Sequence, residues 1–296
     1  MRPPTIAILF LERDRPENYA ISAYAKIWEE GGIKVHHLIG IKTCVPADLL
    51  FLHVNLSVVP GEYLQFARRY PRAVNLHARD IRKRSFSSLV LSSDSDYQGE
   101  VIVKTDLNYG GVPETYLHPN PFFRLASRWQ MLRRMILHPT RNWREDAVYP
   151  VYRSIREVPA ACWRNRHWLV EKFIPERLDG HYVIRNYKFL GNRENTLLLV
   201  SEKPFIREDA LISISPVENE PALQELRRKL RLDFGKFDYV LVDGTPVLID
   251  INKTMGFNPN ASHDPGVVKA RRQLAEGIYD YLGEGCPRDQ MAGLTQ

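Results

Sequence analysis

The sequence has few cysteines and no long apolar run. Its three cysteines, Cys44, Cys162 and Cys286, lie far apart and lack the paired spacing of a metal site. They cannot all pair with one another, so we expect free thiols and a cytoplasmic setting. The longest early apolar run, residues 6–11, is too short to span a bilayer and leads directly into charged residues. We therefore expect neither a signal peptide nor a membrane span.

Glycine-rich phosphate loops of the dinucleotide-binding kind are also missing. The loop after the first apolar segment reads Glu12-Arg13-Asp14-Arg15-Pro16, with no glycine. The chain of 296 residues is 44% hydrophobic and 26% charged, which indicates a folded protein of two or three lobes. Its net charge of +6 suits an anionic ligand. Because the basic residues are scattered and form no known reader motif, nucleic acid is only a minor alternative.

Hydrophobic periodicity predicts an α/β protein that begins with an open α/β domain over residues 1–82. Helical spacing over residues 19–30 ends at Gly31-Gly32 and lies between two apolar runs. The elements expected in this domain are strands at 5–11, 33–39, 48–54 and 73–76, and helices at 19–30 and 62–69. We expect this lobe to lie on the substrate side.

Two further lobes are expected, at residues 83–175 and 176–283, followed by a tail at 284–296. The small lobe has predicted strands at 100–105 and 168–174, with a basic amphipathic stretch at 122–137 that is more typical of core packing than of a membrane surface. The last lobe is predicted to be antiparallel, with two hairpins that turn at 191–194 and 243–246. Its strands are expected at 182–190, 196–202, 237–242 and 247–251, and its helices at 222–230 and 265–282.

The segment 237–252 carries the clearest chemical signal. A tight Asp243-Gly244 turn would set Asp238 and Asp250 on neighbouring strands, and Asn252 would point to the same side as Asp250. Two carboxylates and an amide oxygen are ligands that magnesium favours together with water and substrate phosphates. The alternative is a solvated hairpin whose acids face water. Against it, Asp250 and Asn252 interrupt an otherwise apolar strand.

Two other segments have residues suited to a nucleotide. Lys104 lies on a predicted strand and is followed by the pair Gly110-Gly111, whose N–H groups could approach phosphates. The run 171–174 leads towards Asp179 and could present its backbone to the adenine edge. Taken alone, that run fits a buried strand better, and a lysine with two glycines is weak evidence.

Together and in this order, the segments resemble the ATP-grasp superfamily, which includes D-alanine–D-alanine ligase and glutathione synthetase. The resemblance runs from about Asn75 to Asn252. It implies an ATP-grasp fold with an N-terminal open α/β (pre-ATP-grasp) domain and two ATP-binding lobes. Two features depart from the family: the middle metal position is usually glutamate, and the segment 253–256 stands where a Pro-Gly type turn usually follows the asparagine.

The resemblance implies ATP and Mg²⁺ (or Mn²⁺) as cofactors and assigns roles to single residues. The implied metal ligands are Asp238, Asp250 and Asn252, and the implied catalytic residues near the transferred phosphate are Arg185 and Lys203. The implied nucleotide-binding residues are Lys104, Gly110, Gly111, Glu171, Lys172, Phe173, Ile174, Asp179 and Lys188. Glu176 is a second candidate for the ribose, and Lys83 or Arg84 for a further phosphate contact, although a solvated linker fits those two nearly as well.

The family resemblance implies a carboxylate–amine ligase, or a ligase for a related nucleophile, that works through an acyl phosphate and releases ADP and phosphate. The partners would be a small-molecule or peptide carboxylate and a nucleophile acceptor, and a homodimer is an open alternative. The tract 258–264 could line the acceptor pocket. A second hypothesis is a kinase of the same fold that phosphorylates a hydroxyl. A third is a non-catalytic nucleotide or nucleic-acid binding protein, against which the acidic metal set argues.

Overall fold

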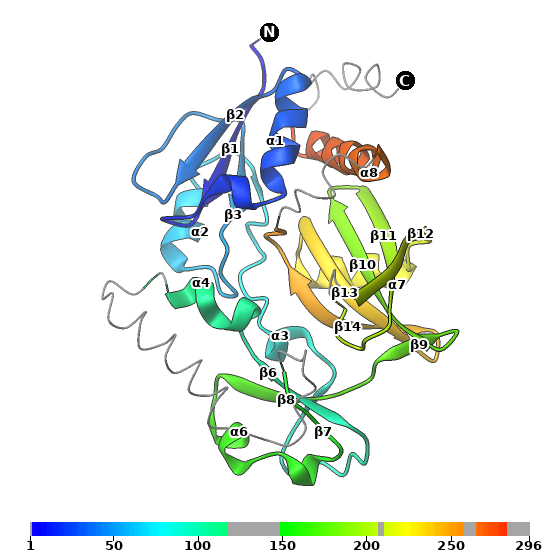
Figure 1. The fold of residues 1–296 in the computed structure, drawn as a ribbon. Coiled ribbons are helices and arrows are strands. Elements are labelled where there is room, and N and C mark those ends of the chain that lie inside the picture. The colour runs from blue at the N-terminus through cyan, green and yellow to red at the C-terminus, as the bar shows by residue number, and fades with distance from the viewer. Residues whose placement is uncertain (1, 116, 118–148, 207–209, 257–264, 283–296) are drawn as a thin grey trace.

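The computed structural model describes residues 2–115, 117, 149–206, 210–256 and 265–282. Three sheets make up this part of the chain: a parallel sheet, a small antiparallel sheet and a larger antiparallel sheet (Figure 1). The predicted mixture of an open α/β lobe with two further sheet lobes is thereby confirmed. Among the described residues, no helix is long and apolar enough to cross a membrane. The segments 122–137, 258–264 and 284–296 lie outside the described residues.

The N-terminal sheet has the strand order β2-β1-β3-β4, and all its strands are parallel. Its strands β1 and β3 are buried along their whole length, as the continuous apolar runs predict. The predicted order of strands and helices is confirmed, with ends that differ by at most two residues. The elements are β1 (Thr5–Phe10), η1 (Pro16–Asn18), α1 (Ile21–Glu30), β2 (Lys34–Ile39), β3 (Leu49–His53), α2 (Gly61–Ala67) and β4 (Ala73–Val74).

The small sheet has the order β5-β8-β6-β7 and is antiparallel. Its two long strands, β6 and β8, were predicted, whereas β5 and β7 are two residues long and too short to show a period. β8 ends at Lys172, two residues before the predicted end, so the run 173–175 is a linker. The elements are α3 (Lys83–Phe86), β5 (Val90–Leu91), β6 (Val101–Thr105), η2 (Asn108–Gly111), α4 (Val112–Thr115), β7 (Val151–Tyr152), η3 (Ile155–Glu157), α6 (Ala160–Arg164) and β8 (Trp168–Lys172).

The large sheet has the order β12-β11-β10-β13-β14, with β9 paired to β10. The two predicted hairpins are joined into this one sheet by antiparallel pairing of β10 with β13. Figure 1 shows α7 against this sheet and α8 next to α1 of the first lobe. The elements are β9 (Glu176–Leu178), β10 (His181–Leu190), β11 (Arg193–Ser201), β12 (Leu211–Val217), α7 (Pro221–Leu230), β13 (Phe234–Val242), β14 (Thr245–Asn252), α8 (Pro265–Ala275) and η5 (Glu276–Asp280).

A β-bulge sets which side chains of β14 face the small lobe. From the two-residue Asp243-Gly244 turn, Tyr239 pairs with Leu248, but Asp238 then pairs with Asp250. Ile249 is therefore the extra residue on β14. Without it, the register of the turn would place Asp250 opposite Phe237, on the buried face. The predicted neighbourhood of Asp238 and Asp250 is confirmed, and it depends on this bulge.

The first lobe is joined to the large sheet through a shared apolar cluster and through Asn75. Trp28 and Phe51 of the first lobe pack with Phe234 of β13, and the Trp28 Nε1–H donates to the Ala275 carbonyl at 2.9 Å. The Asn75 amide is 1% exposed and donates to the Phe234 carbonyl at 2.9 Å. Its Oδ1 accepts from the backbone N–H groups of residues 233 and 234, at 2.9 and 3.0 Å. One side chain therefore satisfies three backbone groups at the junction.

We expect Asn75→Ala to lower the free energy of unfolding by about 3 kcal/mol, because it leaves buried N–H and C=O groups without partners. Its φ of 60° adds to the cost, since asparagine tolerates this region better than alanine. Denaturant unfolding measures the loss. Asn18→Ala, at an exposed position of η1, is the matched control and should change stability by less than about 0.5 kcal/mol. Equal effects of the two substitutions would contradict the role given to Asn75.

His53 makes the stability of the first lobe dependent on pH. Its side chain is fully buried at the end of β3, and neither ring nitrogen has a hydrogen-bond partner among the described residues. Burial, with smaller contributions from Lys253 and His37, lowers the pKa of His53 to about 3. In the unfolded chain the pKa returns to about 6.5, so the unfolded state binds more protons below that pH. The stabilisation is complete above about pH 6.5 and is lost as the pH falls towards 3.

His53→Phe should remove this pH dependence. Between about pH 6 and pH 4, wild-type stability should fall relative to the variant by about 1.4 kcal/mol per pH unit. Urea denaturation across this range gives the two curves, and their difference at about pH 8 corrects for the change in packing against Phe10 and Tyr19. Parallel curves would show that His53 is not held neutral.

Candidate active site

A pocket of about 250 Å³ lies where the small sheet faces the large one. Its walls include Lys104 of β6, the linker after β8, Ile184 of β10 and Asp250 of β14. Most of its lining side chains are apolar or aromatic, and the charged ones are three lysines and one carboxylate: Lys83, Lys104, Lys172 and Asp250. Such a mixture of apolar walls with a few converging polar groups is typical of small-molecule sites.

Lys104 is held at the pocket wall by a buried ion pair. Its Nζ lies 2.9 Å from Glu171 Oε2, across the antiparallel pair β6 and β8. Lys104 is 8% exposed and Glu171 is fully buried. A buried carboxylate needs such a counter-charge, so Glu171 both fixes the lysine and is itself stabilised by it. Both residues were singled out in the sequence, and the structure brings them together.

The linker 173–175 lines the apolar end of the pocket. Phe173 stacks on Phe205, with ring centroids 5.7 Å apart and an interplanar angle of 21°, and Ile174 lies beside it in the lining. The Lys172 ammonium lies 5.2 Å from the centre of the Tyr97 ring. This end of the pocket therefore offers flat apolar surfaces suited to an aromatic base.

The predicted metal ligands form part of a row across the large sheet. Asn186 of β10, Asp238 of β13 and Asp250 of β14 are directly opposite one another, and the Asn186 amide donates to Asp238 Oδ1. Burial raises the pKa of Asp238, although the Lys236 ammonium 2.9 Å away acts in the opposite direction. Asn252 uses its Oδ1 to accept from the Thr254 N–H at 2.8 Å.

These residues fit a magnesium ion in part. Two carboxylates on adjacent strands supply hard oxygen ligands beside a pocket that can hold phosphates, which is the combination that Mg²⁺ uses. No cluster of three or more histidine, cysteine or acidic side chains forms a metal site within the described ranges. Lys236 forms an ion pair with Asp238, and the Lys83 ammonium lies 3.1 Å from Asp250 Oδ1. A cation that binds here would share both carboxylates with these lysines.

Lys83 is the residue whose role was left open by the sequence. It is 5% exposed at the start of α3, pairs with Asp250 and donates to Asn108 Oδ1 at 3.3 Å. Burial disfavours its ammonium, but Asp250 together with Tyr149 and Glu171 outweighs this and raises the pKa of Lys83. The solvated-linker alternative is wrong for this lysine. It holds for Arg84 only in part, because Arg84 is half-exposed and pairs with Asp106.

The loop after β6 reaches the end of β14. Tyr109, Gly110 and Gly111 all have positive φ, at 49°, 67° and 78°, and a Cβ on Gly111 would lie 2.9 Å from Leu107. Tyr109 lines the pocket, and its hydroxyl accepts from the Asn252 amide at 3.1 Å. The glycines therefore allow a turn that places a tyrosine, in addition to their own N–H groups, beside the predicted metal strand.

Four other predicted residues lie away from this row. Arg185 pairs with Glu176 and lies over Tyr239, on the sheet face opposite Asp238. Asp179 is exposed in the turn between β9 and β10, and Lys203 is exposed next to the pocket wall residue Pro204. Lys188 follows Asn186 on the same face but does not line the pocket. Their predicted roles remain predictions.

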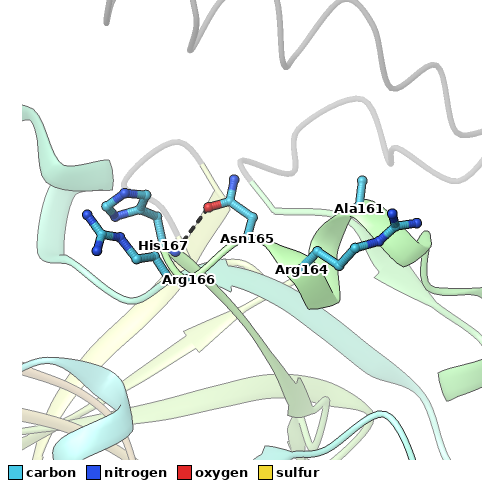
Figure 2. Close-up of a pocket in the computed structure, with 5 residues that line it drawn as sticks. All are labelled: Ala161, Arg164, Asn165, Arg166 and His167. Carbon is cyan, nitrogen blue, oxygen red and sulfur yellow. Dashed lines mark hydrogen bonds between the residues drawn. The ribbon is translucent and has the colours of Figure 1, made fainter.

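A second hollow lies at α6 and the turn that follows it (Figure 2). It is lined by Ala161, Arg164, Asn165, Arg166 and His167, and the His167 N–H donates to Asn165 Oδ1 at 3.1 Å. These five residues include no carboxylate and no large apolar side chain. They offer no carboxylate oxygen for magnesium and no apolar surface for a base, and we place the candidate site in the first pocket.

No protein-family model and no curated protein match the sequence. Several solved structures match it at low identity. An ATP-grasp RimK domain protein from Sphaerobacter thermophilus matches with a TM-score of 0.48 and 11% identity, over 94% of this chain and 99% of that one. D-alanine–D-alanine ligase from Bacillus anthracis complexed with ATP matches with a TM-score of 0.47 and 11% identity, over 99% of this chain and 100% of that one. D-cycloserine synthetase matches with a TM-score of 0.47 and 14% identity, over 94% of this chain and 100% of that one.

In chain order, the described residues form an open α/β sheet, a small antiparallel sheet and a large antiparallel sheet. This is the order of lobes that the resemblance in the sequence implied. Similarities of this size carry no argument about function, so what the site holds is argued from its own residues. Lys104 lies on the small sheet and Asp238 and Asp250 lie on the large sheet, and the nucleotide and metal roles of these residues remain predictions.

Breaking one side of the Lys104–Glu171 pair should destabilise the protein more than removing both. Lys104→Met leaves a buried carboxylate and should lower the free energy of unfolding by about 3 kcal/mol, whereas Lys104→Met with Glu171→Leu should recover most of this loss. Denaturant unfolding in the absence of nucleotide measures the free energy of unfolding of each variant. Glu225→Gln breaks the exposed pair with Arg228 and should cost less than about 1 kcal/mol. Additive effects of the two buried substitutions would show that the pair is not coupled.

Proposed function

We propose that this protein is an ATP- and magnesium-dependent ligase that joins a carboxylate to an amine or a related nucleophile. The observation that carries the proposal is a single pocket with Lys104 on one sheet and Asp250 on the other. An aromatic and apolar end formed by Phe173, Ile174 and Phe205 completes it. Base, phosphates and metal would thus follow one another along the pocket.

The order of side chains on β10 supports this placement. Tyr182 and Ile184 line the apolar end, and Asn186, two residues on, belongs to the row with Asp238 and Asp250. Alternate residues of a strand share a face and advance by about 7 Å. The γ-phosphate of a nucleotide whose base lies on Phe173 would accordingly point towards the carboxylate row.

In the proposed reaction, a carboxylate oxygen of the substrate attacks the γ-phosphorus of ATP, and the bond to the β-phosphate oxygen breaks to release ADP. A nucleophile nitrogen then attacks the acyl carbon, loses its proton, and phosphate leaves. Lys104 and Lys83 would hold phosphate oxygens through fixed positive charge. Asp238 and Asp250 would hold magnesium or manganese, which supplies charge neutralisation at the phosphates when bound.

We place the acceptor at the edge of the first lobe. Thr254 Oγ1 donates to Asn55 Oδ1 at 2.8 Å, and the Asn55 amide donates to the Tyr19 hydroxyl at 2.9 Å. Tyr19 in turn donates to Asp14 at 3.1 Å. This chain of polar groups follows the carboxyl ends of β1 and β3, where parallel sheets commonly bind ligands, and it starts two residues after Asn252.

The substrates are proposed as a small-molecule or peptide carboxylate and a nucleophile acceptor, in a reducing cytoplasm. The free thiols of Cys44 and Cys162 are consistent with that setting. Release of both ADP and phosphate in the presence of an acceptor pair is the test, with pools of amino acids and short peptides as substrates. ADP together with a stable phosphorylated acceptor would identify a kinase instead.

Asp250→Asn should reduce magnesium-dependent ADP release by about a hundredfold or more, because it removes a metal ligand and the charge that holds Lys83. Asp243→Asn is the matched control: it makes the same chemical change at an exposed turn residue of the same hairpin, where φ is 50°. The control should retain wild-type turnover. Wild-type turnover in Asp250→Asn at saturating magnesium would falsify the metal assignment.

A further inference from the structure

A second row of charged side chains lies beside the carboxylate row on the same face of the large sheet. Lys188 of β10 is directly opposite Lys236 of β13, and Lys236 is directly opposite Asn252 of β14. Lys188 lies two residues beyond Asn186, so this lysine row is about 7 Å farther from the apolar end of the pocket. Along the face, the order is base surface, carboxylates, lysines.

The two lysines are not equally neutralised. Lys236 lies 2.9 Å from Asp238 Oδ2. In the part of the chain that the structure describes, no carboxylate lies within 4.0 Å of the Lys188 ammonium. Asp238 attracts the Lys188 ammonium from farther away, whereas Lys236 and Arg271 of α8 repel it. Like charges opposite each other on neighbouring strands are unfavourable, and a half-buried ammonium with no carboxylate at ion-pair distance adds to the cost.

Metal binding would increase this excess of positive charge. If Asp238 binds a magnesium ion, as the proposed function requires, its negative charge is shared between the metal and Lys236. Two ammonium groups then lie next to each other, beyond the place of the γ-phosphate. An anionic group of a ligand is the simplest chemical complement to such a pair.

We propose that Lys188 and Lys236 bind a second carboxylate of the substrate, so that the substrate is a dicarboxylate or carries an equivalent pair of anionic groups. This assignment rests on the proposed function, because the first carboxylate is the one that reacts at the metal row. The second would reach the lysine row, at a spacing of about 7 Å along the strand that a short diacid can span. Lys188 would thus be a specificity-determining residue, and not one that binds the nucleotide.

The test compares diacids with isosteric ligands that lack one charge. Succinate, glutarate and adipate are each titrated calorimetrically against their monoamides, with and without saturating Mg-ADP. For at least one of them, the wild-type protein should bind the diacid about tenfold more tightly than the monoamide. Lys188→Met should reduce this ratio to about one, and Lys188→Arg should retain most of it because the charge is kept. Lys229→Met, at an exposed helix position, is the control and should keep the wild-type ratio.

The preference for the diacid is a ratio, so loss of stability alone does not change it, and the Mg-ADP affinity of Lys188→Met should equal that of the wild type. Equal binding of diacid and monoamide by the wild type, or an unchanged ratio in Lys188→Met, would overturn the proposal. Failure of the proposed function looks different: the wild type would not bind Mg-ADP, while the ratio and its dependence on Lys188 would persist in the titrations without nucleotide.

Discussion

The register between β13 and β14 is the constraint on which the site depends. The Asp243-Gly244 turn fixes the pairing at one end, and the extra residue Ile249 changes it before the chain reaches Asp250. The bulge lets Leu248 pack in the core below the sheet while Asp250, two residues later, faces the pocket above it. A regular strand could not place both side chains in this way, because alternate residues share a face. The carboxylate row therefore follows from one added residue, whereas the lysine row is set by the regular pairing of β10 with β13.

The site also depends on how the first lobe is attached. Asn75 and the cluster around Trp28 fix the first lobe against β13 and α8, and Lys83 and Asn108 fix the small lobe against β14. The Asn108 amide donates to the Ile251 carbonyl at 2.7 Å, one residue before Asn252. The small lobe thus contacts the end of β14 directly, and the first lobe contacts the neighbouring strand β13.

Much of this architecture could be predicted from sequence, because long elements have a clear period. The α/β lobe, the strands that carry Lys104 and Glu171, and the hairpin of Asp238 and Asp250 are examples. The short strands β5, β7 and β9 could not be predicted, because two or three residues show no alternation. The burial of Lys83 could not be predicted either, since it is caused by Asp250, a residue far along the chain. Arg185 is a different case: strand alternation from Tyr187, which lies in the core, would have placed Arg185 on that face and away from Asp238.

The ion pairs at the site have a common physical logic. Three of the acids that the sequence suggested for nucleotide or metal binding have a lysine partner: Glu171 with Lys104, Asp250 with Lys83, and Asp238 with Lys236. Glu176 pairs with Arg185 instead. Partly buried carboxylates without a counter-charge would be unstable, so the lysines supply that counter-charge before a cation is bound. When phosphates and a metal bind together, they can replace the partners within these pairs. The lysines would then contact the phosphates, and the carboxylates would contact the metal. Lys188 is the lysine on this face that has no acid of its own among the described residues, and this imbalance is why we assign it to a further anion of the substrate.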